Sequence, residues 1–162
     1  MLGLAAQWLG VNQTQANSVA PILISEEQGL HKSTFCRMLM PPQLARYYSD
    51  NLKLTAQGNP ERLLAEMGLL NMDEFDKFGA QKMPLLKNLM QMSSLNICKA
   101  YQKNFRSLPR IASFIGTSNR TDLLCDPTGS RRFICIEAEH DIDCTGIEHS
   151  QIYAQLKEEL LA

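Results

Sequence analysis

The stretch that most constrains the fold is residues 21–40, PILISEEQGLHKSTFCRMLM. An apolar run, ILI, leads into a polar turn containing Gly29, and Lys32 and Ser33 then open a helix-like segment that ends before two prolines. A strand, a loop and a helix in this order form the setting of a phosphate-binding loop, in which backbone N–H groups and a lysine hold phosphates while a hydroxyl binds Mg²⁺. The pattern predicts a nucleotide site, and a helix with an ordinary N-cap is the alternative.

The match to a phosphate-binding loop is partial, because its two flanking glycines are replaced. Glu26 occupies the first glycine position and His31 the second, while Gly29 lies inside the loop. A Cβ disfavours the backbone torsions that let N–H groups approach phosphate closely, so we expect both replacements to weaken nucleotide binding and turnover. The candidates for holding the nucleotide are seven consecutive residues: Gln28, Gly29, Leu30, His31, Lys32, Ser33 and Thr34.

Length and composition indicate one ordinary globular domain. The chain has 162 residues, of which 44% are apolar and 20% charged. No run approaches the roughly 18 consecutive apolar residues of a membrane span, and the N-terminus lacks a signal-peptide pattern. We therefore expect a soluble, cytoplasmic protein with no membrane partner. The five cysteines include no Cys-x-x-Cys pair, and the spacing of Cys135, His140, Cys144 and His149 fits no standard zinc pattern.

The net charge of −1 conceals a segregation of charge along the chain. Residues 77–121 include eight lysines and arginines and no Asp or Glu, whereas residues 137–159 include seven acidic residues and a single lysine. A basic stretch of this kind is typical of a surface that faces a polyanion, and a solvated face is the alternative.

Strand and helix patterns alternate along the chain, which predicts an α/β fold with a mainly parallel five-stranded sheet flanked by helices. Asn59 and Pro60 begin a helix that ends at Gly68, and Pro84 opens another with an apolar stripe. The expected strands are residues 22–24, 44–49, 69–72, 110–119 and 133–138, and the last helix is 151–161. A hairpin or protruding loop is expected around the basic segment QKNFRSL.

Three further polar clusters, MDEFD, TSN and GSRR, adjoin expected strands. Those that follow strands converge on one crevice in an open α/β sheet. For phosphoryl chemistry we expect Ser33 and Asp73 to hold Mg²⁺ and Glu74 to polarise the attacking water. Asn119 would orient that water or contact the γ-phosphate, and Arg131 or Arg132 would stabilise the transition state in a neighbouring subunit. Helix caps, a plain turn and ion pairs to Glu137 or Glu139 are the structural alternatives.

With these motifs the sequence resembles the virulence-associated protein E family of phage and mobile-element proteins, which are similar to superfamily 3 helicases and primase-helicases among the AAA+-like ATPases. The resemblance rests on ILISEEQGLHKSTF, LLNMDEFDKF, RIASFIGTSNRTDLL and DPTGSRRF. It implies Walker A, Walker B, sensor 1 and arginine-finger roles for the residues above. It also implies that the basic stretch of residues 94–110 is the hairpin before sensor 1, which contacts DNA in related helicases, with Lys99, Lys103, Arg106 and Arg110 as candidates.

The expected function is an ATP-hydrolysing motor module of a replication or mobile-element protein, which uses ATP and Mg²⁺ and acts on nucleic acid, chiefly single-stranded DNA, as a homo-oligomeric ring. Residues 1–20 are expected to form an N-terminal segment and residues 21–162 the ATPase domain of a longer protein. Two alternatives remain open. One is a non-hydrolysing module that binds nucleotide or nucleic acid, and the other is a small-molecule kinase with a phosphate-binding loop.

Overall fold

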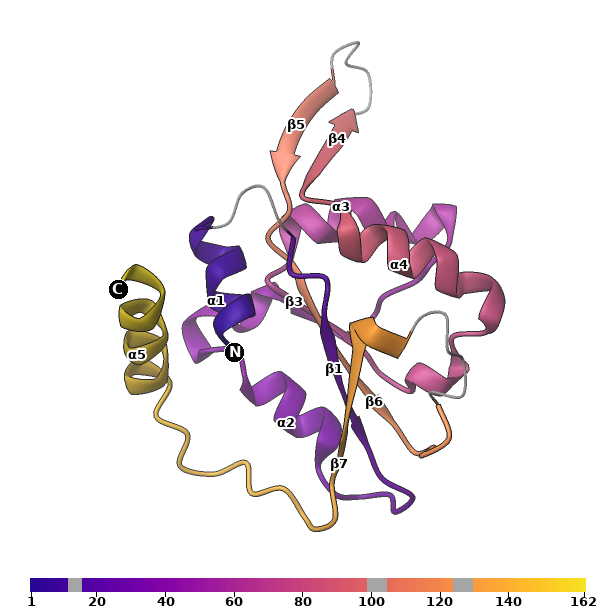
Figure 1. The fold of residues 1–162 in the computed structure, drawn as a ribbon, viewed down its shortest axis with the longest axis vertical. Helices are drawn as coiled ribbons and strands as arrows, with labels where there is room; N and C mark the ends of the chain where they lie inside the picture. The colour runs from indigo at the N-terminus through magenta and orange to yellow at the C-terminus, as the bar shows by residue number, and fades with distance from the viewer. Residues whose placement is uncertain (12–15, 99–104, 124–129) are drawn as a thin grey trace.

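The structure is a computed structural model that describes residues 1–11, 16–98, 105–123 and 130–162. Its centre is a five-stranded parallel sheet in the order β2-β3-β6-β1-β7 (Figure 1). The strands are β1 (Ala20–Ile24), β2 (Tyr48–Ser49), β3 (Leu69–Met72), β6 (Ser113–Ser118) and β7 (Phe133–Glu137). Every residue of β3 and β6 is buried, as expected for parallel strands that are covered on both faces. The predicted α/β fold is confirmed.

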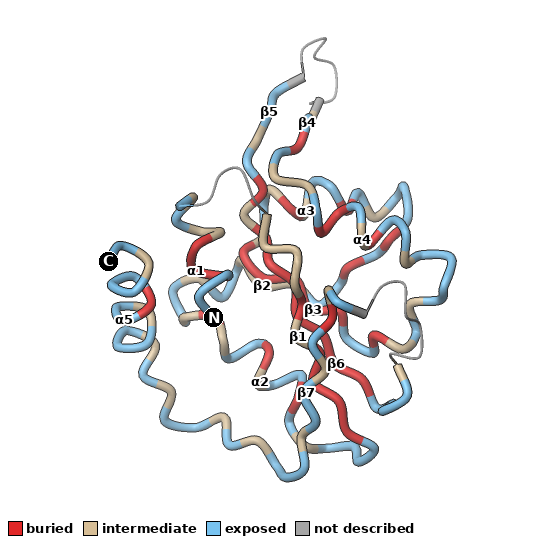
Figure 2. Tube along the Cα trace, in the orientation of Figure 1, coloured by how far each residue is buried: buried red, intermediate tan, exposed pale blue. Residues whose placement is uncertain are grey.

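Helices cover both faces of the sheet (Figure 1). One face packs against α3 (Pro60–Glu66) and α4 (Met83–Gln91), and its core includes Ile22 of β1 and Phe114 of β6. The other face packs against α1 (Leu2–Leu9) and α2 (Lys32–Met38), where Leu23 and Ile115 meet the fully buried Cys36. Figure 2 shows the buried segments concentrated in the central strands. The alternating strand residues therefore supply two separate cores.

The predicted strand at residues 44–49 is mostly wrong. Pro42–Tyr47 forms a 3₁₀ helix, and only Tyr48–Ser49 is extended, pairing with Leu69 and Leu70. Pro42 suits a first helical turn because it lacks an N–H and has a fixed φ. The turn is closed by the N–H of Leu44, which donates to the Pro41 carbonyl at 2.8 Å. Strand β2 is consequently a very short edge strand.

The predicted hairpin is present and protrudes from the sheet (Figure 1). Its strands, β4 (Ser94–Cys98) and β5 (Phe105–Pro109), pair antiparallel from Ser94 opposite Pro109 to Cys98 opposite Phe105. Lys99 and Lys103, two of the expected DNA contacts, lie outside the described residues.

After β7 the chain forms a strap, residues 138–148, that runs past α2 to the last helix, α5 (His149–Leu161) (Figure 1). The strap begins where the N–H of Ala138 donates to the Ile24 carbonyl at 2.8 Å. Helix α5 packs against α1, where the rings of Tyr153 and Trp8 stack with centroids 5.6 Å apart. The strap and α5 thus lie on the α1 and α2 face of the sheet, where α5 packs against the N-terminal helix.

Candidate functional site

A cavity of about 420 Å³ lies at the carboxyl ends of β1, β3 and β6. The polar clusters that follow these three strands line it together, as the sequence predicts for a crevice at strand ends. Its lining consists of Gln28, Gly29, Leu30, His31, Lys32, Ser33, Thr34, Asp73, Glu74, Thr117, Ser118 and Asn119. The structure therefore brings together all seven predicted loop residues and the predicted Asp73, Glu74 and Asn119.

The loop between β1 and α2 uses left-handed backbone torsions at two positions. Gly29 has a φ of 85°, which glycine adopts without strain. His31, directly before α2, has φ 58° and ψ 23°, a conformation that residues with a Cβ rarely adopt. The loop thus keeps left-handed torsions at the second glycine position of the motif although histidine occupies it.

Lys32 lies at the centre of the cavity and is buried, with 7% of its surface exposed. Its Nζ donates to three oxygens: Ser25 Oγ at 2.5 Å, Asn119 Oδ1 at 3.0 Å and the Glu27 carbonyl at 3.2 Å. Burial lowers the pKa of Lys32, and the negative charge of Asp73 partly opposes that effect. A buried ammonium without a directly bonded carboxylate favours the arrival of an anion, which supports a phosphate site.

Asp73 connects the helix and two strands at the cavity floor. Its Oδ1 accepts hydrogen bonds from Ser33 Oγ at 2.7 Å and from Thr117 Oγ1 at 2.5 Å. A hydroxyl next to a carboxylate is the oxygen pair that Mg²⁺ uses beside phosphate oxygens and water. These two predicted metal ligands therefore fit the ion. Among the described residues no group of three or more His, Cys, Asp or Glu side chains is arranged to hold a metal.

Glu74 is held in a strained backbone conformation at the end of β3, with φ 51° and ψ 52°. Its N–H donates to Thr117 Oγ1 at 3.3 Å, and its carboxylate forms an exposed ion pair with Lys77 at 2.6 Å. The hydrogen bond to Glu74 raises the pKa of Lys77. An exposed ion pair of this kind is weak, so the carboxylate is free to turn toward a bound water.

Three further residues, which the sequence analysis did not single out, support the site. Thr117 contacts both Asp73 and the backbone of Glu74, and Ser25 receives the Lys32 ammonium. Ser118 Oγ donates to Asp76 Oδ1 at 2.7 Å, which ties β6 to the turn after β3. The sequence pattern that could have identified these residues is a polar side chain directly after an apolar run. That pattern alone does not distinguish a functional site from an ordinary turn.

The two candidate arginines lie away from this cavity. Arg131 and Arg132 belong to a 3₁₀ turn, Ser130–Arg132, that precedes β7. Because β7 runs parallel to β1, its start lies at the opposite end of the sheet from the cavity. Neither arginine lines the cavity of its own chain.

Arg110 is not placed as expected for a nucleic-acid contact. The side chain is 1% exposed and donates to the carbonyls of Met90 at 2.6 Å, Asn17 and Ala112 at 2.8 Å, and Met92 at 3.3 Å. The guanidinium thus connects α4, the start of β6 and the segment before β1, and a side chain buried in this way does not fit the expected contact with DNA. Burial lowers the pKa of Arg110 to about 10. Arg106, on β5, is exposed.

The five-stranded parallel sheet flanked by helices, with the loop between β1 and α2 at its carboxyl end, is an α/β fold consistent with that of P-loop NTPases. Residues 10–160 match the Virulence-associated protein E-like domain, so the chain belongs to that family. The expected family is confirmed.

Two solved structures share the fold, both titled as A-form apo structures of the NrS-1 C-terminal region. Each has a TM-score of 0.56 and 21% sequence identity over 98% of this chain. The chain spans only 37% and 38% of those two chains. No curated protein matches the chain, and no helix within the described ranges is long and apolar enough to cross a membrane.

Proposed function

We propose that this chain is the ATP-binding and ATP-hydrolysing motor module of a phage or mobile-element replication protein. The observation that carries the proposal is the buried Lys32 ammonium, which forms no ion pair with a carboxylate of the described residues and lines one cavity with the Ser33 and Asp73 pair at strand ends. A cation that is costly to bury and an oxygen pair suited to Mg²⁺ are both explained by a nucleoside triphosphate. The proposed setting is the cytoplasm, as part of a longer protein.

Each residue of the cavity has a role in this proposal. Lys32 and the N–H groups of residues 28–34 hold the phosphates, while Ser33 and Asp73 hold Mg²⁺ directly or through water. The ion, when bound, neutralises charge on the phosphate oxygens. Glu74 accepts a proton from the attacking water, and Asn119 orients it. Thr117 fixes the positions of the Asp73 carboxylate and the Glu74 backbone through its two hydrogen bonds.

The proposal extends to a head-to-tail assembly on single-stranded DNA. The position of Arg131 and Arg132 supports it. Arg131 is exposed and Arg132 is half-buried, and both lie at the end of the sheet opposite their own cavity, so they are better placed to contact the cavity of a second subunit. The protruding hairpin with exposed Arg106 supports a contact with the DNA phosphates. A non-hydrolysing nucleotide-binding module is the second candidate, favoured by His31 and Glu26 in the glycine positions.

The test is Mg²⁺-dependent ATP hydrolysis by wild type, Lys32→Ala and Glu74→Gln, with and without single-stranded DNA, at several protein concentrations. We expect turnover that rises with DNA and with protein concentration. Each substitution is expected to reduce it by at least about 10²-fold, because each removes a charge or proton acceptor from the reacting phosphate.

Lys157→Ala and Glu159→Gln on α5 are the matched controls, since both residues are exposed and distant from the cavity lining. They should retain wild-type turnover. Nucleotide binding by wild type without turnover at any concentration, with or without DNA, would favour the non-hydrolysing module. Absence of nucleotide binding would refute both candidates.

A further inference from the structure

The phosphate-binding loop contains a backbone conformation that its own sequence disfavours. His31 adopts φ 58° and ψ 23° at a position where a glycine would adopt these torsions freely. The side chain is exposed, so burial of its ring does not hold the backbone in place. Such a torsion persists only where surrounding contacts over-determine it. The contacts of His31 therefore reveal what shapes the loop.

The strap supplies those contacts. His31 Nδ1 lies 2.6 Å from Asp141 Oδ1, and the N–H of Ile142 donates to the Leu30 carbonyl at 3.3 Å. An ionised carboxylate only accepts hydrogen bonds, so Nδ1 carries the proton in this pair. Two consecutive strap residues thus contact two consecutive residues of the loop.

The strap is itself fixed on both sides of these contacts. Upstream, Ala138 is hydrogen-bonded to the end of β1. Downstream, His149 Nε2 lies 2.6 Å from the Met38 carbonyl, and Tyr153 Oη donates to the Leu39 carbonyl at 2.7 Å. Because these anchors lie at the end of β1 and at the far end of α2, Asp141 approaches His31 from a support tied to both elements that flank the loop.

We propose that Asp141 is a positioning residue for the phosphate-binding loop, holding His31 in the left-handed conformation that a glycine would adopt unaided. The strap thereby stabilises a left-handed backbone conformation that glycine would adopt without support and that histidine disfavours at the second glycine position. The inference rests on the proposed function in one respect, namely that the loop binds nucleotide phosphates. The positioning of His31 is a property of the protein without nucleotide.

The test is a double-mutant cycle with Asp141→Ala and His31→Gly, read out as ADP and ATP affinity. Asp141→Ala should weaken binding by up to about fivefold, because the pair with His31 is exposed and the loop then samples the binding conformation less often. In the His31→Gly background the same substitution should change affinity by less than about twofold, since glycine needs no support.

Two variants separate geometry from charge. Asp141→Asn keeps an oxygen that can accept a hydrogen bond from the Nδ1–H of His31, so it should retain most of the wild-type affinity. Asp143→Ala is the matched control, because its carboxylate accepts from the N–H and Oγ1 of Thr145 within the strap, at 2.8 and 2.6 Å, and not from the phosphate-binding loop among the described residues. If Asp141 acted only through its charge, its removal would instead tighten phosphate binding, and that result would overturn the inference.

A second readout needs no nucleotide. Thermal unfolding of the same four proteins of the cycle should show coupling, with Asp141→Ala lowering Tm when residue 31 is histidine and leaving it unchanged when residue 31 is glycine. Additive Tm changes would refute the positioning role whether or not nucleotide binds. Coupled Tm values in a protein that binds no nucleotide would keep the role of Asp141 and refute the proposed function.

Discussion

At the scale of single residues, Arg110 shows that a buried charged side chain has a structural role where an exposed one could bind a ligand. Its four hydrogen bonds all go to backbone carbonyls. We predict that Arg110→Met lowers the free energy of unfolding by about 3 kcal/mol, because the methionine leaves several buried acceptors without donors. Tm should fall by about 6–12 °C, at about 2–4 °C per kcal/mol for a domain of this size. Thermal and urea unfolding measure both.

The control for this substitution is Arg106→Met, four residues earlier in the same basic segment. Arg106 is exposed on β5, so its loss should change Tm by no more than about 1 °C, as for most surface substitutions. Equal stability of the two variants would contradict the structural role of Arg110. Sequence alone gave both arginines the same interpretation, since charge density along a segment carries no information about which side chain turns inward.

At the scale of elements, the sequence predicted those parts whose signal is local. Strand β3 was expected at residues 69–72 and is Leu69–Met72, because a short apolar run follows a helix stop at Gly68. The loop before α2 and the acidic end of β3 were likewise visible. The 3₁₀ helix at Pro42–Tyr47 was not, since LARYYS has strand-like residues and only the preceding prolines favour the turn.

Long-range pairings were beyond what the sequence could predict. The contact between His31 and Asp141 joins residues 110 positions apart, and Thr117 reaches Asp73 across 44 positions. No spacing rule relates such residues before the sheet order is known. The sequence therefore predicted which strand ends carry the site but did not identify the strap that supports the loop.

The hairpin carries the element-scale prediction about nucleic acid. Lys99, Lys103 and Arg106 are expected to neutralise three phosphates of single-stranded DNA. Replacing all three with alanine should weaken binding and reduce the slope of log K against log salt concentration by about 2, from roughly 0.7 per phosphate on a single strand. Fluorescence anisotropy with a labelled oligonucleotide at four salt concentrations measures the slope.

A triple variant with the same change in net charge is the control for the hairpin. Lys53, Lys82 and Lys157 are exposed and lie outside β4 and β5, so their replacement by alanine should leave the salt slope nearly unchanged. An equal loss of slope in both triple variants would mean that the DNA responds to overall charge and not to the hairpin.

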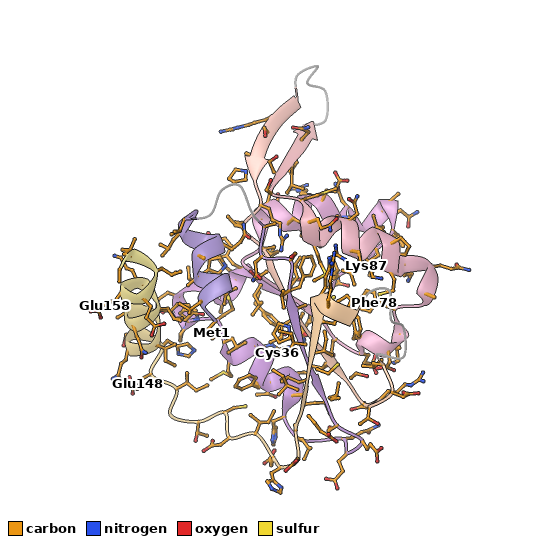
Figure 3. All side chains as sticks on the ribbon, in the orientation of Figure 1. Met1, Cys36, Phe78, Lys87, Glu148 and Glu158 are labelled. Atoms are coloured by element: carbon orange, nitrogen blue, oxygen red, sulfur yellow. The ribbon has the colours of Figure 1, made fainter. Side chains whose placement is uncertain are left out.

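At the scale of the whole molecule, the acidic C-terminal segment lies to one side. Figure 3 shows Glu148 and Glu158 at that edge, whereas Lys87 of α4 lies nearer the middle of the view. Head-to-tail contacts between subunits close into rings when the rotation between subunits allows it. Such an arrangement suits a site whose arginine comes from a neighbour, since Arg131 and Arg132 lie at the far end of the sheet from their own cavity.

Mixing two inactive variants tests this assembly directly. A variant with Arg131→Ala and Arg132→Ala keeps an intact cavity but lacks the arginines, whereas Glu74→Gln keeps the arginines but lacks the proton acceptor. Each alone should be at least about 10²-fold slower than wild type. In a mixture, some interfaces combine an intact cavity with intact arginines, so ATPase activity should recover to a substantial fraction of wild type and peak near equal proportions. Recovery requires that arginines act between subunits. Activity that simply averages the two inactive variants at every ratio, in a preparation shown to be oligomeric by light scattering, would instead mean that the arginines act within their own subunit and would contradict the proposed assembly.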